Sequence, residues 1–179
     1  AILATGNLED ILSHKTPATR MIELGEQALI PGFIDAHGHL PAVARRVEII
    51  DLASPPVGTI KNIDDIIALV KAWIQAENIP PGTWVFGAGY DDSLLAENRH
   101  PTRGDLDQAS SEHPIVLTHV SGHLLAVNTL ALELQNVNAD TDNPDGGVIR
   151  RRSGTREPNG VMEETAMRPF SRGRFVEAD

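Results

Sequence analysis

The sequence predicts an α/β fold, because apolar runs typical of buried strands alternate with a pattern typical of helices. Three strand candidates, residues 28–40, 83–90 and 115–120, are short and largely apolar, and each contains or follows a proline or glycine. Between the first two, the apolar residues of 62–79 recur at intervals of three and four, which places them on one side of a helix. This alternation of strands and helix indicates the α/β class.

The composition excludes several classes of protein. The chain has 179 residues, 41% of them hydrophobic, which is ordinary for one globular domain. Its 25 acidic residues outnumber 15 Lys and Arg, so it lacks the basic face that nucleic acid requires. No apolar run approaches the roughly 18 residues of a membrane span, and the absence of cysteine excludes disulfides and thiolate ligands. We therefore expect a cytoplasmic protein in which histidines and carboxylates hold any metal.

The first strand candidate, residues 28–40, ends in a His-Gly-His sequence. Side chains alternate between the two faces of a strand, so Asp35, His37 and His39 point the same way. The two histidine backbones then lie roughly 6 to 7 Å apart, and both rings can reach one cation at about 2.0 to 2.1 Å. A His-x-His pair alone also occurs by chance on surfaces, but the apolar strand and the nearby acid favour a metal site.

The segments around this strand are less regular. Residues 1–29 contain short apolar patches separated by glycine and polar turns, so they form either short strands or a loosely ordered arm. Another strand candidate covers residues 47–52. The predicted helix has Asn62 as its N-cap and ends at Pro80-Pro81-Gly82. Trp73 shares the apolar stripe of this helix, so we expect it to be structural.

Polar residues follow the strand at 83–90. Tyr90, Asp91 and Asp92 fall at its carboxyl end, although a solvated acidic loop remains an equal alternative for Asp92. Further along, Thr102-Arg-Gly-Asp105 has the form of a capping box that opens a short helix.

The strand at 115–120 leads into a predicted helix over residues 124–134. His119 and His123 are four residues apart, which is the spacing of a metal-binding pair on a helix. Glycine and β-branched residues around them argue against a helix there. We expect the remaining histidines to be structural or to lie in loops: His113 and His119 in the first group and His100 in the second.

A hairpin is predicted near the end of the chain. Residues 140–151 begin like a calcium-binding loop, but Pro144 stands at its fifth position and Arg151 at its twelfth, where glutamate is required. We instead predict a turn followed by strands 148–152 and 161–164. The three arginines of the first strand are expected to form a solvated edge.

Five stretches occur in a fixed order along the chain. They are LIPGFIDAHGHL from Leu29, VFGAGYDDSLL from Val85, RHPTRGDLDQAS from Arg99, HPIVLTHVSGHLLAVNTLAL from His113 and DGGVIRRRSGTREPNGVMEETAM from Asp145. Together they resemble the amidohydrolase superfamily, in particular amidohydrolase family 3, which includes N-substituted formamide deformylases. The resemblance implies an α/β fold: the N-terminal part of a metal-dependent (β/α) barrel, with an inserted hairpin, over 30–179, and a remnant of a small β-sandwich over 1–29.

The resemblance also implies a metal site. His37 and His39 would hold a first divalent ion, Glu164 would bridge to a second, and Asp35 would orient an imidazole from behind. The alternative for Glu164 is an exposed acid at a helix start. Zinc is the expected metal, although Mn, Fe and Ni accept the same ligands.

The implied reaction is hydrolysis of a carbon–nitrogen bond in a non-peptide amide or cyclic amide. Tyr90, Asp91 and His123 would contact this small-molecule substrate. A complete barrel needs about 250 residues, and the family site uses two later histidines and a general-base Asp, whereas His123 is the last histidine here. We therefore expect a fragment with little turnover of its own, whose general base lies beyond residue 179.

Two other functions stay open. The chain is either a catalytically silent structural module whose exposed strand edges drive self-association, for example as a homodimer, or part of a mononuclear deaminase. The deaminase would share the pair formed by His37 and His39 but would not need Glu164.

Overall fold

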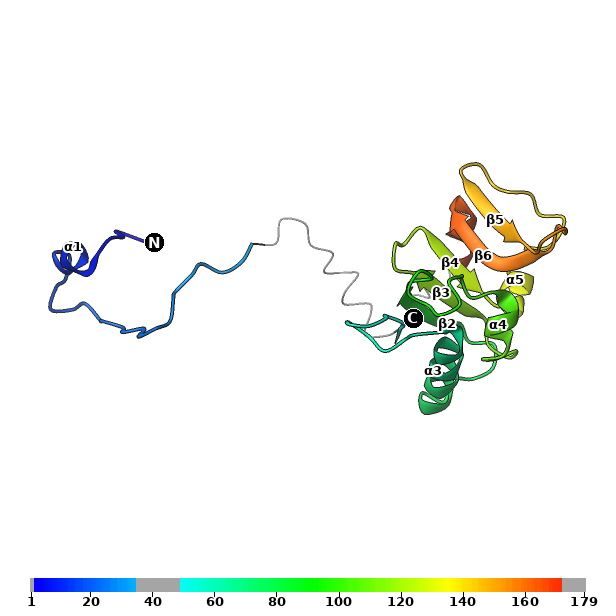
Figure 1. Ribbon diagram of the computed structural model, residues 1–179, viewed down its shortest axis with the longest axis horizontal. Coiled ribbons are helices and arrows are strands. Elements are labelled where there is room, and N and C mark those ends of the chain that lie inside the picture. The colour runs from blue at the N-terminus through cyan, green and yellow to red at the C-terminus, as the bar shows by residue number, and fades with distance from the viewer. Residues whose placement is uncertain (1, 35–48, 172–179) are drawn as a thin grey trace, which may run out of the picture. The chain divides into compact units, whose positions relative to one another are not determined.

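A computed structural model describes residues 2–34 and 49–171 of the chain (Figure 1). The chain divides into two compact units, Ala1–Gly38 and His39–Asp179. No helix in the described ranges is long and apolar enough to cross a membrane.

The described part of the first unit, residues 2–34, contains helix α1 (Leu8–Leu12) and no strand. Asn7 caps α1 by accepting a hydrogen bond from the N–H of Asp10. The strand expected from residue 28 is therefore not formed over residues 28–34, since a strand needs a neighbour for its backbone hydrogen bonds. Residues 2–29 likewise contain no strand of a β-sandwich, and the boundary at residue 29 stays a prediction.

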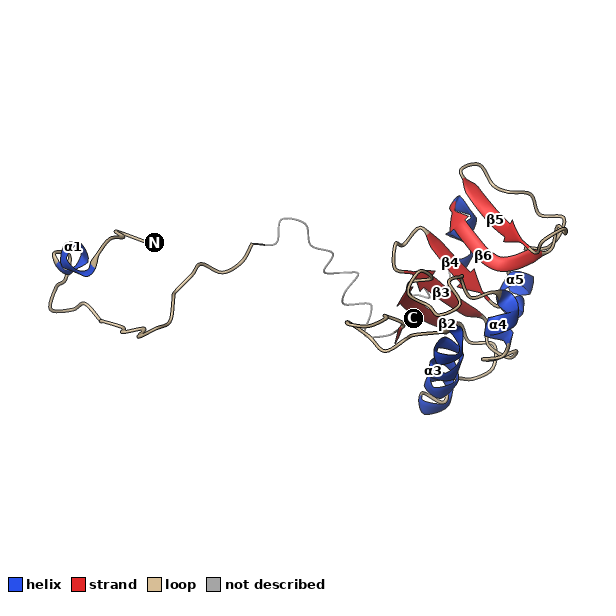
Figure 2. Cartoon of the chain, in the orientation of Figure 1, coloured by secondary structure: helices blue, strands red, loops and turns tan. Residues whose placement is uncertain are grey.

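The second unit contains one six-stranded sheet in the order β1-β2-β3-β4-β6-β5 (Figure 2). The first three strands are parallel, and β4, β5 and β6 pair antiparallel with their neighbours. The (β/α) barrel stays a prediction, because β1 and β5 are the edges of this sheet within the described residues. The strands are β1 (Ile50–Asp51), β2 (Val85–Tyr90), β3 (Ile115–His119), β4 (Leu124–Val127), β5 (Gly147–Arg151) and β6 (Pro158–Glu164).

The structure confirms most of the elements expected in this unit. Strands β2 and β3 and the β5–β6 hairpin form where the sequence predicted them. Helix α3 (Ile63–Ala76) begins after Asn62, whose side chain accepts from the N–H of Asp65. Helix α4 (Arg103–Asp107) opens with the predicted capping box at Thr102.

The helix predicted over residues 124–134 is wrong in its first half. Residues 124–127 form β4, because β3 and β6 on either side take up its backbone hydrogen bonds. Helix α5 (Thr129–Leu134) begins only after Asn128, a buried residue whose side chain accepts from the N–H of Ala131. The described part of the chain ends in a 3₁₀ turn (Thr165–Met167) and helix α6 (Arg168–Ser171).

Hydrophobic cores lie on both faces of the sheet. On one face, side chains such as Val85 and Leu117 pack with Ile66 and Val70 of α3, and Trp73 adds to this core as predicted. On the other face, strand side chains pack with α5 and α6. Because neighbouring residues of one strand face opposite cores, the sheet is a central layer with helices on each side.

One edge of the sheet, at the carboxyl ends of β2 and β3, collects polar residues from β2, β3 and β6 and from the turn between β3 and β4. Tyr90 at the end of β2 lies opposite His119 at the end of β3. Strand β4 runs back from this edge, and its first residue pairs with Glu163 near the end of β6. The segments 90–92, 119–123 and 163–164 therefore meet at the carboxyl ends of the parallel strands, where α/β folds place ligand sites.

Candidate functional site

A carboxylate shared by two histidines lies at this edge. Asp92 Oδ1 lies 3.1 Å from Nε2 of His119 and 3.5 Å from Nδ1 of His100. Both imidazole side chains are largely buried, and their rings are in edge-to-face contact with centroids 5.7 Å apart. We call Tyr90, Asp92, His100 and His119 the Asp92 cluster.

Tyr90 forms the buried floor of the Asp92 cluster. Its ring has edge-to-face contacts with His100 and His119, at centroid distances of 6.0 and 5.2 Å. Its hydroxyl lies 3.4 Å from Nδ1 of His100. Burial, reinforced by the charge of Asp92, raises the pKa of this hydroxyl far above its ordinary value of about 10. The hydroxyl therefore keeps its proton within hydrogen-bond distance of His100 Nδ1.

Burial is the main reason why His100 is neutral at pH 7. Burial lowers the pKa of its imidazole, and Arg150 and His119 lower it further, whereas Asp92 acts in the opposite direction. Nδ1 of His100 lies between the Tyr90 hydroxyl and the Asp92 carboxylate, so the tautomer of the neutral ring depends on which of the two it bonds.

The backbone fixes the other imidazole. The N–H of Ser121 donates to Nδ1 of His119 at 3.1 Å, and the Ser121 hydroxyl contacts the same nitrogen at 2.9 Å. A neutral His119 therefore carries its proton on Nε2, which is buried beside Asp92 but outside hydrogen-bond geometry.

One group of side chains among the described residues has the spacing of metal ligands. The ligand atoms of Asp91, Asp92 and His119 lie within 4.8 Å of one another. Hydrogen bonds from Ser93 lower the pKa of Asp91, so its carboxylate is ionised at neutral pH. Metal binding through Nε2 of His119, however, requires the proton on Nδ1, which loses the hydrogen bond from the Ser121 N–H and keeps only the contact with the Ser121 hydroxyl.

A second pair, formed by His123 and Glu164, is much more exposed. Nδ1 of His123 lies 3.1 Å from Oε1 of Glu164, and the N–H of Glu164 donates to the carbonyl oxygen of His123. Glu164 has a φ of 51°, which is rare outside glycine and is common at functional sites. The sequence assigned different roles to these residues, and the structure brings them together.

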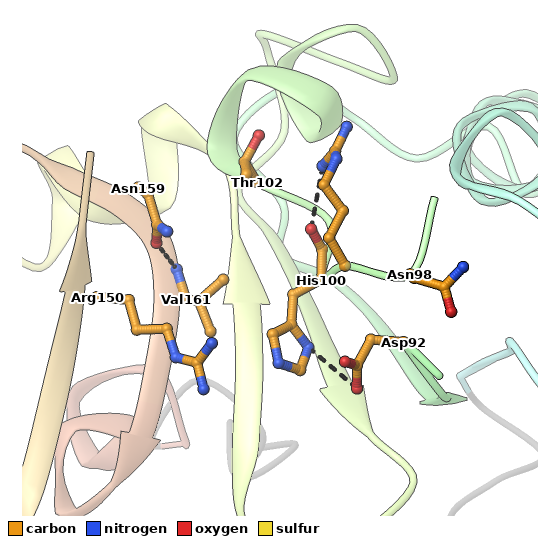
Figure 3. A pocket seen from close by; sticks show the side chains of 8 residues that line it. Asp92, Asn98, His100, Thr102, Arg150, Asn159 and Val161 are labelled. Atoms are coloured by element: carbon orange, nitrogen blue, oxygen red, sulfur yellow. Dashed lines mark hydrogen bonds and ion pairs between the residues drawn. The ribbon is translucent and has the colours of Figure 1, made fainter. Parts of the chain in front are cut away.

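A polar pocket opens beside the Asp92 cluster (Figure 3). Its volume is about 360 Å³, within the usual range for sites that hold small molecules. Arg150 of β5 enters this pocket and pairs with Glu163, while Glu164 turns to His123, as expected for neighbours on a strand. The polar lining comprises Asp92, Asn98, Arg99, His100, Thr102, Arg150 and Asn159.

The structure corrects several sequence-based expectations. His119 was expected to be only structural and His100 only a loop residue, yet both belong to the Asp92 cluster. Asp92 is a partly exposed loop acid that contacts both imidazoles. Arg150 is exposed on the edge strand β5, as expected for a solvated edge, and it also pairs with Glu163. Only one signal in the sequence pointed to this site: the positions of Asp92 and His119 at the ends of adjacent strands.

Other predicted roles remain predictions. Tyr90 is fully buried, and Asp91 lies beside the Asp92 cluster, so their expected contact with substrate is untested. Asp35, His37 and His39 lie outside the described residues.

Comparisons with known proteins agree with the resemblance seen in the sequence. The profile of the amidohydrolase family matches residues 20–174. An N-substituted formamide deformylase of Arthrobacter pascens is 33% identical over 166 residues, which are 92% of this chain and 29% of that protein. A putative amidohydrolase, YtcJ, of Bacillus subtilis is 28% identical over 166 residues, 92% of this chain and 30% of that protein. The chain thus spans less than a third of the length of these two relatives.

A solved structure shares the fold. An uncharacterized metal-dependent hydrolase from Pyrococcus horikoshii OT3 superimposes with a TM-score of 0.50 at 24% identity, over 80% of this chain and 24% of that one. At this identity the likeness concerns the fold alone.

Proposed function

The chain belongs to the amidohydrolase family, and from this premise we propose that it supplies part of the active site of a metal-dependent hydrolase. The bond cleaved is a carbon–nitrogen bond in a non-peptide amide or cyclic amide of small size. The observation that carries the proposal is the meeting of Asp91, His119, His123 and Glu164 at one edge of the sheet. This edge holds the carboxyl ends of the parallel strands, where α/β enzymes place their chemistry.

The exposed carboxylate of Glu164 at this edge suits a divalent metal. Glu164 and His123 present a carboxylate and an imidazole nitrogen within 3.1 Å of each other, and both side chains are open to solvent. We propose that Glu164 acts with His37 and His39 as the ligand set, with Asp35 orienting one imidazole. Zinc suits these nitrogen and oxygen donors. When bound, the ion supplies an acidified water and polarises the substrate carbonyl.

The chain's own residues would position the substrate around this centre. His123, already held by the backbone and side chain of Glu164, would donate to the substrate through its free edge. Asp91, kept ionised by Ser93, would accept from an N–H group. Tyr90 would affect the bound substrate indirectly, through the contact of its hydroxyl with His100.

The metal content of the purified chain tests this proposal. We expect the native chain to retain zinc after gel filtration, as measured by mass spectrometry. Replacing His37 and His39 by Ala should remove it, whereas His14→Ala, which changes an exposed histidine in the same unit as His37, should leave it unchanged. Zinc retained by the double variant would contradict the assigned ligands.

Glu164 separates a two-metal hydrolase from a mononuclear deaminase. Glu164→Gln should weaken metal binding at least tenfold, as loss of a ligand or its close support does. Glu163→Gln is the matched control, because its side chain pairs with Arg150 instead. An unchanged metal content in Glu164→Gln would move the assignment to the deaminase.

A structural role is favoured by one observation in the first unit. Residues 2–34 expose several large apolar side chains, among them Leu3, Phe33 and Ile34, all more than 90% exposed. Such surface favours burial against another chain. A homodimer in analytical ultracentrifugation, with no retained metal, would support the self-associating module over the hydrolase.

A further inference from the structure

The pocket beside the Asp92 cluster has donors on facing walls. The Arg150 side chain enters from the hairpin, and its Nε donates to Glu163. In Figure 3 the His100 ring enters from the facing wall, with Nδ1 on the side of Asp92 and Nε2 turned toward Arg150. Arg150 is close enough for its charge to act on the His100 imidazole.

The hydrogen bonds of this pocket determine which ligand atoms it accepts. Nδ1 of His100 lies beside the Tyr90 hydroxyl, and in the tautomer in which it accepts from that hydroxyl, Nε2–H is a donor to the pocket. Asn159 uses its Oδ1 to accept from the N–H of Val161, which leaves its NH₂ end as a donor as well. An arginine, an imidazole N–H and an amide NH₂ around one space together require an acceptor-rich group, and a carboxylate fits a guanidinium best.

Asp92 supplies a hydrogen-bond acceptor, in contrast to the donors described above. Its carboxylate lines the same pocket and lies on the far side of His100 from Arg150 (Figure 3). The Asp92 carboxylate would repel an anionic group of the ligand on its side of the pocket and would accept a hydrogen bond from an N–H group. The second arginine of the pocket, Arg99, uses both terminal nitrogens on Asp105, whereas Arg150 pairs with Glu163 through Nε.

We propose that this pocket binds a small carboxylate ligand whose oxygens accept from Arg150 and His100 and whose own N–H group donates to Asp92. The ligand class is a short carboxylate with an amide or amine nitrogen near the acid group. That this ligand is the charged end of a substrate rests on the proposed function, whereas the pocket itself does not depend on metal or turnover.

A pair of matched probes tests the ligand class. N-acetylglycine carries both the carboxylate and the N–H group, and N-acetylglycinamide differs only in lacking the acid. We expect N-acetylglycine to shift the His100 ring signals of the full 179-residue chain in NMR titrations, with an affinity at least tenfold higher than that of the amide. Equal binding of the two probes would overturn the proposal.

Variants then locate the site. Arg150→Met should lower the affinity for N-acetylglycine at least tenfold, while Arg152→Met, which removes an exposed arginine two residues away, should change it less than twofold. Because Arg150→Met leaves Glu163 without its partner, the double variant with Glu163→Gln serves as the folded test, and Glu163→Gln alone should retain binding. Undiminished binding in the double variant would overturn the proposal.

The chelator 1,10-phenanthroline distinguishes this pocket from the proposed metal centre. Binding of N-acetylglycine should be unaffected by the chelator, because Arg150, His100 and Asp92 are not proposed ligands. If the chelator abolished binding, the carboxylate would be held by a metal and the pocket proposal would fail. If the native chain held no metal before chelation and still bound N-acetylglycine, the proposed function would fail and the pocket would stand.

Discussion

The Asp92 cluster and the His123–Glu164 pair lie at the same edge of one sheet and differ in burial. The His100 and His119 side chains are 11% and 13% exposed, whereas those of His123 and Glu164 are 70% and 57% exposed. Buried polar groups are costly unless partnered, so the cluster is fixed by its own contacts. The exposed pair contributes little to folding and is free to bind a ligand. Burial therefore separates a fixed part of the site from an open one.

Tyr90→Ala should have the largest effect on stability. The ring is fully buried in contact with both imidazoles of the Asp92 cluster, and its removal leaves a cavity that should cost about 3–5 kcal/mol. Tyr90→Phe keeps the ring and should cost about 1 kcal/mol. Urea denaturation measures both values, and a small effect of the alanine variant would mean that the cluster is not part of the core.

Asp92→Asn should come next. The amide cannot replace the charge beside Nε2 of His119, and we expect a loss of about 1–2 kcal/mol in the free energy of unfolding. Asp91→Asn is the matched control, because its main partner is the neighbouring Ser93, and the expected loss is below about 1 kcal/mol. Equal losses of stability at the two positions would show that Asp92 contributes no more to folding than Asp91.

Low pH should lower the free energy of unfolding through His100 of the buried Asp92 cluster. Burial holds the folded pKa of His100 below its ordinary value of about 6.5. Between these two pKa values the unfolded chain binds more protons, so stability should fall as pH drops below about 6.5 and should gain nothing from His100 above it. His100→Asn should flatten this pH dependence in denaturation curves recorded from pH 5 to 8. An unchanged slope would show that other groups cause it.

The smallest stability effect is expected at the exposed pair. His123→Ala should change the free energy of unfolding by less than about 1 kcal/mol, since both partners are solvated. The same denaturation assay measures it. A loss above about 2 kcal/mol would place this pair in the structural part of the site and would end the contrast with the Asp92 cluster.

Local patterns were sufficient for most of the second unit. The apolar stripe and the Asn62 cap predicted α3, and the capping box predicted the start of α4. Residues 124–134 failed because their apolar pattern suits either a strand or a helix. Pairing with β3 and β6, which no local pattern shows, decided the strand.

The site was predicted less completely than the fold. The resemblance singled out Glu164 and His123 separately, but their contact depends on strand β4 running back beside β6. Arg150 looked like one of three solvated arginines, and only its position on β5 reveals the pocket and the pairing with Glu163. Residues far apart in the sequence come together through strand order, which is a property of the whole sheet.

The sequence by itself determined the amidohydrolase family, the α/β class and the capped helices, because these depend on residue order and on interactions within a few residues. The tertiary structure alone decided which polar residues are buried together. Asp92, His100 and His119 became one cluster because β2 and β3 end side by side and the segment after Asp92 returns His100 to it. Burial and shared charge arise only when distant segments pack, and they set the protonation of His100 and of Tyr90.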